Sequence, residues 1–332
     1  MKSHSTFTKT LARAALLLPL PLLVSIPLAA QAQAWPAAKP IRLVIGFAPG
    51  GAADFVARTL SEPLAKLLGQ SVVVENRAGA GSSLAADFVS KAPADGYTLL
   101  IASPSSVSVN PSLNPKLAYM KDLVALTRLT SSPLVLAVNP ASGIGSMQEL
   151  IAAARAKPGV LNYSTSGNGS APHLGAAHFS AVAGVEMVHI PYKGGGPAIA
   201  AVVAGDAQLT FGTPPSVLPM VQAGRLKALA VTSPNGSALV PNVPGTIEAG
   251  LPSYSLSFWY GFFVPAGTPA DISKKLFDAT QAVMQRADVK SALAREGAEV
   301  AMSKSPEEFA NFLVDDNRFW ARLVKESGVK AE

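Results

Sequence analysis

Short apolar runs alternate with longer segments of helical periodicity along most of the chain. Early runs at residues 41–45, 71–75 and 97–102 predict short buried strands. Residues 54–68, between the first two runs, place their apolar side chains near one face of a helix. The alternation resumes with apolar runs at residues 161–165, 188–190, 208–212 and 228–232. Repeated strand–helix–strand units predict an α/β fold with doubly wound, mainly parallel sheets.

Capping residues mark three helix starts. Ser146 with Glu149, and Ser305 with Glu308, have the spacing of a capping box, and Pro269 stands at the expected first position of a third helix. The last helix carries an apolar stripe that could be a partner surface, although this spacing more often faces a core. We expect the stripe in the core; it comprises Phe309, Phe312, Leu313, Phe319, Trp320, Leu323 and Val324.

Two similar segments, at residues 135–143 and 261–269, predict a chain of two lobes. Each is an apolar strand that ends in a Pro-Ala turn and opens a helix. We expect residues 35–138 plus 261–332 to form lobe one, and residues 139–260 to form lobe two. The two strands that cross between the lobes would form a hinge around a cleft. Two folds joined by one linker would need a polar linker, which the sequence lacks.

The N-terminal segment, residues 1–34, has the pattern of a secretory signal peptide. It begins with basic residues and continues without charge to an Ala-x-Ala site at its end. A membrane anchor is the alternative, but the apolar part is shorter than the roughly 20 residues needed to span a bilayer, and prolines interrupt it. We therefore expect export to a bacterial periplasm and a mature protein that is not inserted in the membrane.

Charge and cysteine content narrow the class further. The formal net charge is +6, and the signal peptide carries half of it as Lys2, Lys9 and Arg13, so a nucleic-acid partner loses its main support. The chain has no cysteine, which excludes disulfides and a lipid-modified cysteine at the mature N-terminus. We expect a free periplasmic monomer.

Motif searches favour neither a cofactor nor an enzyme. Residues 46–51 match the first half of a P-loop, but Ala52 and Ala53 replace the lysine and the hydroxyl residue that would follow. Residues 79–84 resemble a dinucleotide fingerprint only weakly, since Leu84 stands where a small residue is needed. The mature chain has three histidines, none at a recognised metal spacing, and no Gly-x-Ser-x-Gly elbow. We predict no metal, no cofactor and no catalysis; a secreted esterase-like enzyme is the less favoured alternative.

Four turns rich in glycine and hydroxyl residues follow predicted strands, two in each lobe. They span residues 47–54, 103–108, 164–170 and 192–196. In open α/β sheets the ligand lies at this edge, and a helix start there offers free N–H groups to an anion. The turns therefore predict a cleft for a small carboxylate. Asp54 either caps its own turn or is a surface acid, and Lys193 either pairs with the acid or is solvated.

Seven motifs resemble those of the Bug-type receptors, the periplasmic solute-binding proteins of tripartite tricarboxylate transporters. In the family's order they read FAPGGAAD, VENRAGAG, APADGYTL, SGNGSAPHL, IPYKGGGPA, AGRLKALAVTS and PAGTP, and they cover nearly the whole mature chain. The resemblance implies a two-lobed Venus flytrap that binds a mono-, di- or tricarboxylate through backbone amides and waters. It also implies a membrane permease as partner, with a carboxylate sensor for a signalling protein as the alternative.

The resemblance also assigns ligand-binding residues. In lobe one they are Phe47, Pro49, Gly50, Gly51, Ala52 and Asp54, with Ser103, Ser105 and Ser106 beside them; in lobe two they are Ser166, Gly167, Asn168, Gly169, Ser170, His173 and Tyr192. The chain departs from the family at Gln208 and at Gly212-Thr213, where acidic and amide residues are usual. We add Thr213 to the site because this departure lies near the cleft, where it bears on the identity of the ligand.

Overall fold

Every predicted strand is present in the computed structural model, which describes residues 34–330; the predicted signal peptide, up to residue 33, lies outside this range. The strands are β1 Ile41–Ile45, β2 Val72–Asn76, β3 Thr98–Ala102, β5 Val135–Val138, β6 Asn162–Thr165, β7 Val188–Pro191, β8 Leu209–Gly212, β9 Lys227–Val231 and β10 Phe258–Pro265. Two further strands, β4 (Leu123–Ser132) and β11 (Glu299–Val300), were not predicted. Threonines and Arg128 interrupt the apolar pattern of β4.

The strands form two mixed sheets rather than mainly parallel ones. The first has the order β11-β4-β10-β3-β1-β2, and the second has the order β7-β6-β8-β5-β9. β1 is parallel to β2 and β3, and β6 is parallel to β7 and β8. β10 is antiparallel to β3 and β4, and β5 is antiparallel to β8 and β9. The four strands that flank the crossings, β4, β5, β9 and β10, all form antiparallel pairs, and so does the edge strand β11 with β4.

The first crossing lies earlier in the chain than predicted. A boundary at residue 138 would place β5 in lobe one, but β5 pairs with β8 and β9 of the second sheet. The chain therefore leaves the first sheet after Ser132 and enters the second at Val135. It returns between β9 and β10. Below, lobe one and lobe two mean the elements of the first and second sheet; their limits in sequence remain a prediction.

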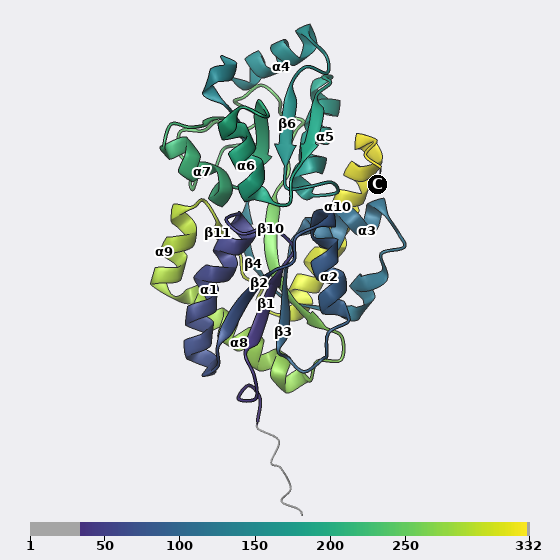
Figure 1. Cartoon of the computed structure of the whole chain (residues 1–332), viewed down its shortest axis with the longest axis vertical. Helices are drawn as coiled ribbons and strands as arrows, with labels where there is room; N and C mark the ends of the chain where they lie inside the picture. The colour runs from purple at the N-terminus through teal and green to yellow at the C-terminus, as the bar shows by residue number, and fades with distance from the viewer. Residues whose placement is uncertain (1–33, 331–332) are drawn as a thin grey trace, which may run out of the picture. The chain divides into compact units, whose positions relative to one another are not determined.

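Helices flank both sheets (Figure 1). They are α1 Ala52–Leu68, α2 Ser83–Ser90, α3 Asn110–Leu113, α4 Met147–Ala156, α5 Ala171–Ala183, α6 Gly195–Ala204, α7 Pro214–Gln222, α8 Ala270–Gln285, α9 Ala287–Arg295 and α10 Pro306–Ser327. Two predicted caps are confirmed: the hydroxyl groups of Ser146 and Ser305 accept from the N–H groups of Glu149 and Glu308, at 3.1 and 3.2 Å. α8 begins one residue later than predicted, since Pro269 precedes the helix.

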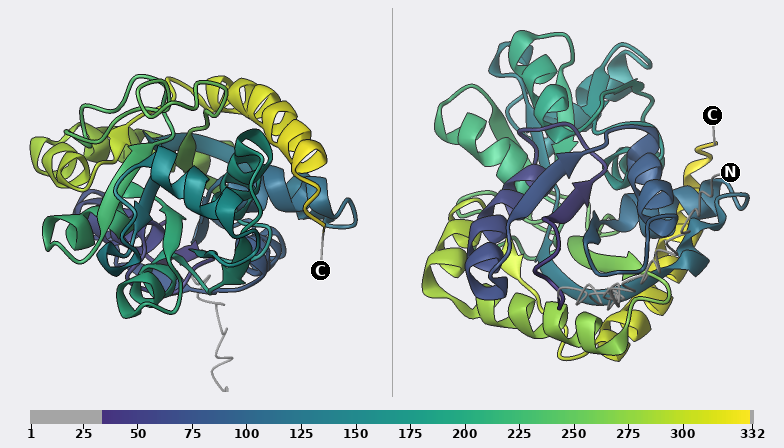
Figure 2. Two further views of the ribbon diagram at one scale, coloured as in Figure 1. Left: turned by 90° about the horizontal axis from the view of Figure 1, so that it is seen from above. Right: turned by 60° about the horizontal axis from the view of Figure 1, so that its bottom comes forward.

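Helix α10 connects the two lobes. Its predicted apolar stripe is largely core: Phe309 and Trp320 are fully buried. The helix packs on β4 in lobe one, and its C-terminal part contacts α5 of lobe two (Figures 1 and 2). Core residues of both lobes also belong to one continuous cluster, which includes Leu134 and Phe258 next to the crossings. Within residues 34–330, we find no helix with the length and apolar character needed to cross a membrane.

Candidate functional site

The turn after β1 presents the start of α1 to lobe two. Gly50 has a positive φ of 81°, which lets the chain turn sharply, and Gly51 is the N-cap of α1 with no side-chain cap of its own. The first-turn amides of a helix lack partners within the helix. One of them, the N–H of Ala52, donates to Ser216 Oγ of lobe two at 3.1 Å. The N-terminus of α1 therefore lies directly at the junction of the lobes.

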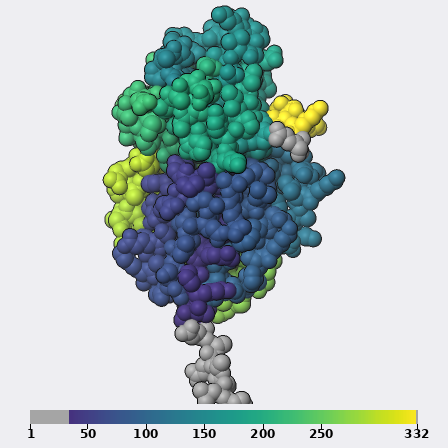
Figure 3. Space-filling model, viewed as in Figure 1, coloured from purple at the N-terminus to yellow at the C-terminus, as the bar shows by residue number. Residues whose placement is uncertain are grey.

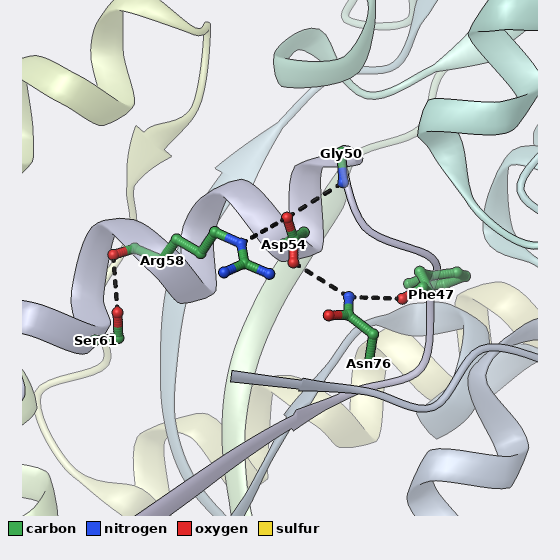
Figure 4. A network of polar contacts seen from close by, with 6 residues as sticks. All are labelled: Phe47, Gly50, Asp54, Arg58, Ser61 and Asn76. Carbon is green, nitrogen blue, oxygen red and sulfur yellow. Dashed lines mark hydrogen bonds and ion pairs between the residues drawn. The ribbon is translucent and has the colours of Figure 1, made fainter. Parts of the chain in front are cut away.

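The carboxylate of Asp54 stabilises this turn by hydrogen bonds (Figure 4). Its carboxylate accepts from Gly50 N at 3.2 Å, from Arg58 Nε at 2.9 Å and from Asn76 Nδ2 at 3.2 Å. Asn76 also donates to the carbonyl of Phe47 at 3.0 Å. Burial alone would raise the pKa of Asp54, but the bonds from Arg58, Gly50 and Asn76 together lower it below the ordinary value. Of the two roles predicted for Asp54, the structure therefore shows the cap.

We expect Asp54→Asn to lower the free energy of unfolding by about 1 to 2 kcal/mol at pH 7, because the charged bonds to Gly50 and Arg58 weaken. Since folding lowers the pKa of Asp54, its contribution is present above about pH 4 and is lost as the pH falls through the folded pKa. Urea unfolding at pH 7 and pH 3 measures this effect. The difference in free energy of unfolding between wild type and variant should be smaller at pH 3 than at pH 7.

The control for Asp54→Asn is Asp315→Asn, which removes an exposed carboxylate that pairs with Arg318 on α10. Exposed pairs contribute little, so this change should stay within about 0.5 kcal/mol of wild type. The stabilising role of Asp54 would be contradicted if both variants lost the same free energy of unfolding. It would also be contradicted if the free-energy difference between Asp54→Asn and wild type stayed the same at pH 3.

Four hydrogen bonds join the lobes around the predicted turns. Besides Ala52 N to Ser216, Ala48 N donates to the carbonyl of Lys193 at 2.8 Å. Across the same junction, Ala171 N donates to Ser105 Oγ at 2.9 Å, and Asn110 Nδ2 donates to the carbonyl of Gly169 at 3.1 Å. The purple residues at the start of α1 meet the green residues of lobe two without an open gap on the face seen in Figure 3.

Close backbone approach explains two of the glycines at this junction. A Cβ on Gly194 would lie 2.9 Å from the amide nitrogen of Ala48, and one on Gly196 would lie 3.1 Å from the carbonyl carbon of Gly50. Both neighbours are backbone atoms, which cannot rotate away as a side chain can. The glycine turn of residues 192–196 thus lets α6 approach α1 closely.

A small cavity of about 30 Å³ lies where the lobes meet. Space of this size holds one or two water molecules. Residues from the turns after β1 and β6, from helices α1, α5, α6 and α7, and from strands β8 and β10 enclose it: Phe47, Gly51, Ala52, Ala53, Ser166, Pro172, Gly195, Ala198, Ile199, Thr210, Phe211, Gly212, Thr213, Ser216, Phe258 and Tyr260. The only ionisable side chain among these lining residues is the phenol of Tyr260, whose pKa is raised by burial.

The predicted binding residues divide into three groups. Those that line the cavity are Phe47, Gly51, Ala52, Ser166 and Thr213. Those that lie on the turns and loops near the lobe junction, but do not line the cavity, are Pro49, Gly50, Ser105, Gly167, Asn168, Gly169, Ser170 and Tyr192. The remaining four, Asp54, Ser103, Ser106 and His173, are buried and do not line the cavity. Contact with a ligand stays a prediction for every one of them.

His173 supports a cleft loop together with a second histidine that the sequence did not single out. Its ring stacks on that of His189, with the ring centroids 3.8 Å apart. His173 Nδ1 accepts from Gly169 N at 3.3 Å, while His189 Nε2 lies 2.6 Å from Thr165 Oγ1. Burial lowers the pKa of His173 to about 4 and that of His189 to about 3, so both rings are neutral near pH 7. The pair therefore holds the backbone of the loop that follows β6.

Sequence reasoning missed several residues of the site. Ser216 lies in the first turn of α7, and Phe258 and Tyr260 come from the crossing strand β10. Gly195, in the first turn of α6, belonged to the predicted turn of residues 192–196 but was not named as a binding residue. The Pro-Pro pair before Ser216 marks a helix start after a strand, which could have indicated it. From sequence alone, Phe258 and Tyr260 look like ordinary core residues. β10 is buried along its whole length, so its sequence shows no alternation of apolar and polar residues that would distinguish a cavity-facing side.

Two mixed α/β sheets, joined by two crossings around a cavity at their junction, define the class of periplasmic binding proteins. The family model described as "Tripartite tricarboxylate transporter family receptor" (TctC) matches residues 56–329, and the chain belongs to this family. Protein BugT of Bordetella pertussis is 37% identical over 296 residues, which are 88% of this chain and 90% of BugT. The expected relation to Bug-type receptors is thereby confirmed.

Solved structures agree with this assignment. One, an R. palustris protein with adipate, has a TM-score of 0.85 and 31% identity and covers 89% of this chain and 99% of its own. Another, MatC from Rhodopseudomonas palustris with bound malate, has a TM-score of 0.83 and 30% identity and covers 87% of this chain and 99% of its own. The two-lobed α/β fold expected from the sequence is confirmed.

Proposed function

We propose that this receptor is exported to the periplasm, binds a small organic carboxylate between its lobes and delivers it to the membrane permease of a tripartite tricarboxylate transporter. The observation that carries the proposal is the N-terminus of α1, which points an amide across the junction to Ser216, at the wall of a cavity without charged side chains. The adipate and malate in the two related structures support a carboxylate as the ligand class.

Backbone amides can supply the binding energy. A carboxylate at the start of α1 would replace Ser216 as the acceptor and would meet the positive end of the helix dipole. Hydrogen bonds to a charged group contribute about 1.5 to 3 kcal/mol each, and micromolar affinity corresponds to about 8 kcal/mol. About four to six donors, some of them water molecules, are therefore sufficient even after ordering costs.

Binding requires movement of the lobes. A cavity of about 30 Å³ is too small for an organic acid, so the lobes must separate to admit one and close around it. The crossings between β4 and β5 and between β9 and β10 are the natural hinge. In this proposal the closed, loaded form is the one that docks on the permease.

We expect saturation with a bound carboxylate to lower the radius of gyration in solution, because the open lobes close on the ligand. Small-angle scattering with and without the acid measures this change. The acid is best identified first, by mass spectrometry of what co-purifies with the protein. Calorimetry first confirms that the ligand binds. If the radius of gyration then stays constant at saturation, the hinged closure is wrong.

Two other functions predict different results. An esterase-like enzyme would convert the bound compound, so recovery of the acid unchanged after long incubation favours a receptor. A sensor would leave uptake of the acid intact when its gene is deleted, whereas a transport receptor would not. The family favours the transport role.

A further inference from the structure

The turn between β2 and α2, residues 79–82, has an unusual backbone. Among residues 34–330, three residues other than glycine have a positive φ, and two of them are in this turn: Ala80 at 46° and Ser82 at 78°. Gly81 between them has φ 55°. A left-handed conformation brings the Cβ of an L-residue too close to the following carbonyl oxygen, so glycine adopts it readily, whereas alanine and serine do not. The backbone is therefore strained at both Ala80 and Ser82.

The turn is packed between the end of β1 and lobe two. On one side, Ser82 lies so close to Gly46, directly after β1, that a Cβ on Gly46 would overlap it. On the other side, a Cβ on Gly81 would lie 2.6 Å from the carbonyl oxygen of Asn168 and 3.1 Å from the carbonyl carbon of Gly169. Both of these residues belong to the loop after β6 in lobe two. The turn of residues 79–82 is therefore part of the lobe junction.

Lobe two supplies part of the contacts that hold the turn. Inside lobe one, Ser82 N donates to the carbonyl of Gly79 at 3.0 Å, and Asn110 Nδ2 donates to the carbonyl of Gly81, also at 3.0 Å. The same Asn110 group donates to the carbonyl of Gly169 across the junction. The packing of Gly81 on the loop after β6 requires the lobes to be together. Separation of the lobes would leave the turn with the contacts of lobe one alone.

The side chain of Ser82 does not offset the strain with a bond of its own. Its hydroxyl group is buried and has no hydrogen-bond partner within the part of the chain that the structure describes. Burying a hydroxyl group without a partner is unfavourable. A strained conformation persists only where the surrounding structure imposes it. For this turn, the surroundings that change when the lobes separate are those of the junction.

We propose that the turn of residues 79–82 is strained most in the closed form and relaxes when the lobes separate, so that Ala80 and Ser82 set how much of the unliganded protein is closed. The inference rests on the hinged closure of the proposed function. Strain in the closed form favours the open one, and the observed affinity falls in proportion to the closed fraction. The two residues are positioning residues, which act on the ligand only through closure.

Glycine at both positions removes the strain and tests the inference. Without ligand, the radius of gyration of the double variant Ala80→Gly, Ser82→Gly should shift toward that of the saturated wild-type protein, which small-angle scattering measures. Each single variant should bind about threefold more tightly than wild type, and the double variant about tenfold. Calorimetry compares them with adipate, malate and the acid that co-purifies. An unliganded radius that stays at the wild-type value in the double variant overturns the inference.

Urea unfolding of the same variants separates two kinds of strain. If the turn is equally strained in the open and closed forms, the glycine variants gain stability but keep the affinity and the radius of wild type. That result would overturn the inference. A gain in affinity that accompanies the smaller radius supports it, because only strain that differs between the two forms changes their populations.

Two control variants distinguish strain from other effects of the substitutions. Ala78→Gly makes the same chemical change just before the turn, at a residue whose φ is not positive. Ser82→Ala keeps a left-handed residue but removes the unpartnered hydroxyl group. Both should bind within about twofold of wild type. The inference would be overturned if Ala78→Gly gained as much affinity as Ala80→Gly, or if Ser82→Ala gained as much as Ser82→Gly.

Failure of this inference is distinguishable from failure of the proposed function. If an acid lowers the radius of gyration of wild type at saturation and the glycine variants behave as wild type does, the strained turn has no part in closure and the receptor role stands. If an acid binds and the wild-type radius does not fall, the hinged closure is wrong, and the inference is overturned with it.

Discussion

Gly51→Val is expected to weaken carboxylate binding at least about 100-fold while leaving the protein folded, because several amide donors are lost together. The new Cβ would lie 3.3 to 3.4 Å from the amide nitrogens of Gly195 and Gly196, beside the start of α1, which we propose holds the acid. Gly51 has φ −96°, which valine readily adopts. Gly51 is an N-cap without a side-chain hydrogen bond, so Gly51→Val should lower the free energy of unfolding by no more than about 1 kcal/mol.

Gly145→Val is the control for this experiment. Gly145 precedes the N-cap of α4, and the atoms nearest to a Cβ there are the side-chain ends of Glu149 and Lys227. Calorimetry with the co-purified acid, together with urea unfolding, compares the two variants. Unchanged affinity in a folded Gly51→Val protein would remove the α1 turn from the site, and loss of binding in Gly145→Val would show that the effect is not local.

Local signals explain why most of the fold could be predicted. Strands such as β1 are short apolar runs, and α4 and α10 begin at serines whose hydroxyl groups accept from the backbone three residues later. Strand β4 was missed because its burial depends on β10, which joins the sheet more than a hundred residues later. Strand direction was wrong near the crossings for the same reason: pairing with a distant segment leaves no local pattern.

The candidate site shows the same division. The turn of residues 47–54 was predicted because its glycines follow a strand and precede a helix. The role of Asp54 could not be decided from sequence, since one of its partners, Asn76, lies on β2, 22 residues further along the chain. The helix start at Ser216 has a local signal, but its pairing with Ala52 could not be predicted, because 164 residues of chain separate the two. Which hydroxyl group faces which helix start depends on how the two lobes pack.

Asn110→Ala is expected to weaken ligand binding by about 10- to 100-fold, because it removes a side chain that holds both lobes. The Asn110 amide nitrogen lies 3.0 Å from the carbonyl of Gly81 and 2.8 Å from that of Ser105, both in lobe one, and 3.1 Å from that of Gly169 in lobe two. Alanine would leave the carbonyls of Gly81 and Gly169 without this donor and the junction with a void, whereas the carbonyl of Ser105 still accepts from the backbone N–H of Asn110. The closed form, which binds the acid, would be less populated.

The variant should therefore also have a larger radius of gyration without ligand than wild type, which scattering can measure on the same samples as the calorimetry. Asn114→Ala is the matched control, because Asn114 accepts from Lys116 N in an exposed local turn and has no part in the junction. Gly169 has φ +64° and its Cβ position is filled by Asn110, so a glycine and an amide are fitted to each other across the lobes. If folded Asn110→Ala keeps both the affinity and the radius of wild type, this contact does not stabilise the closed form, and closure must depend on the bonds around α1.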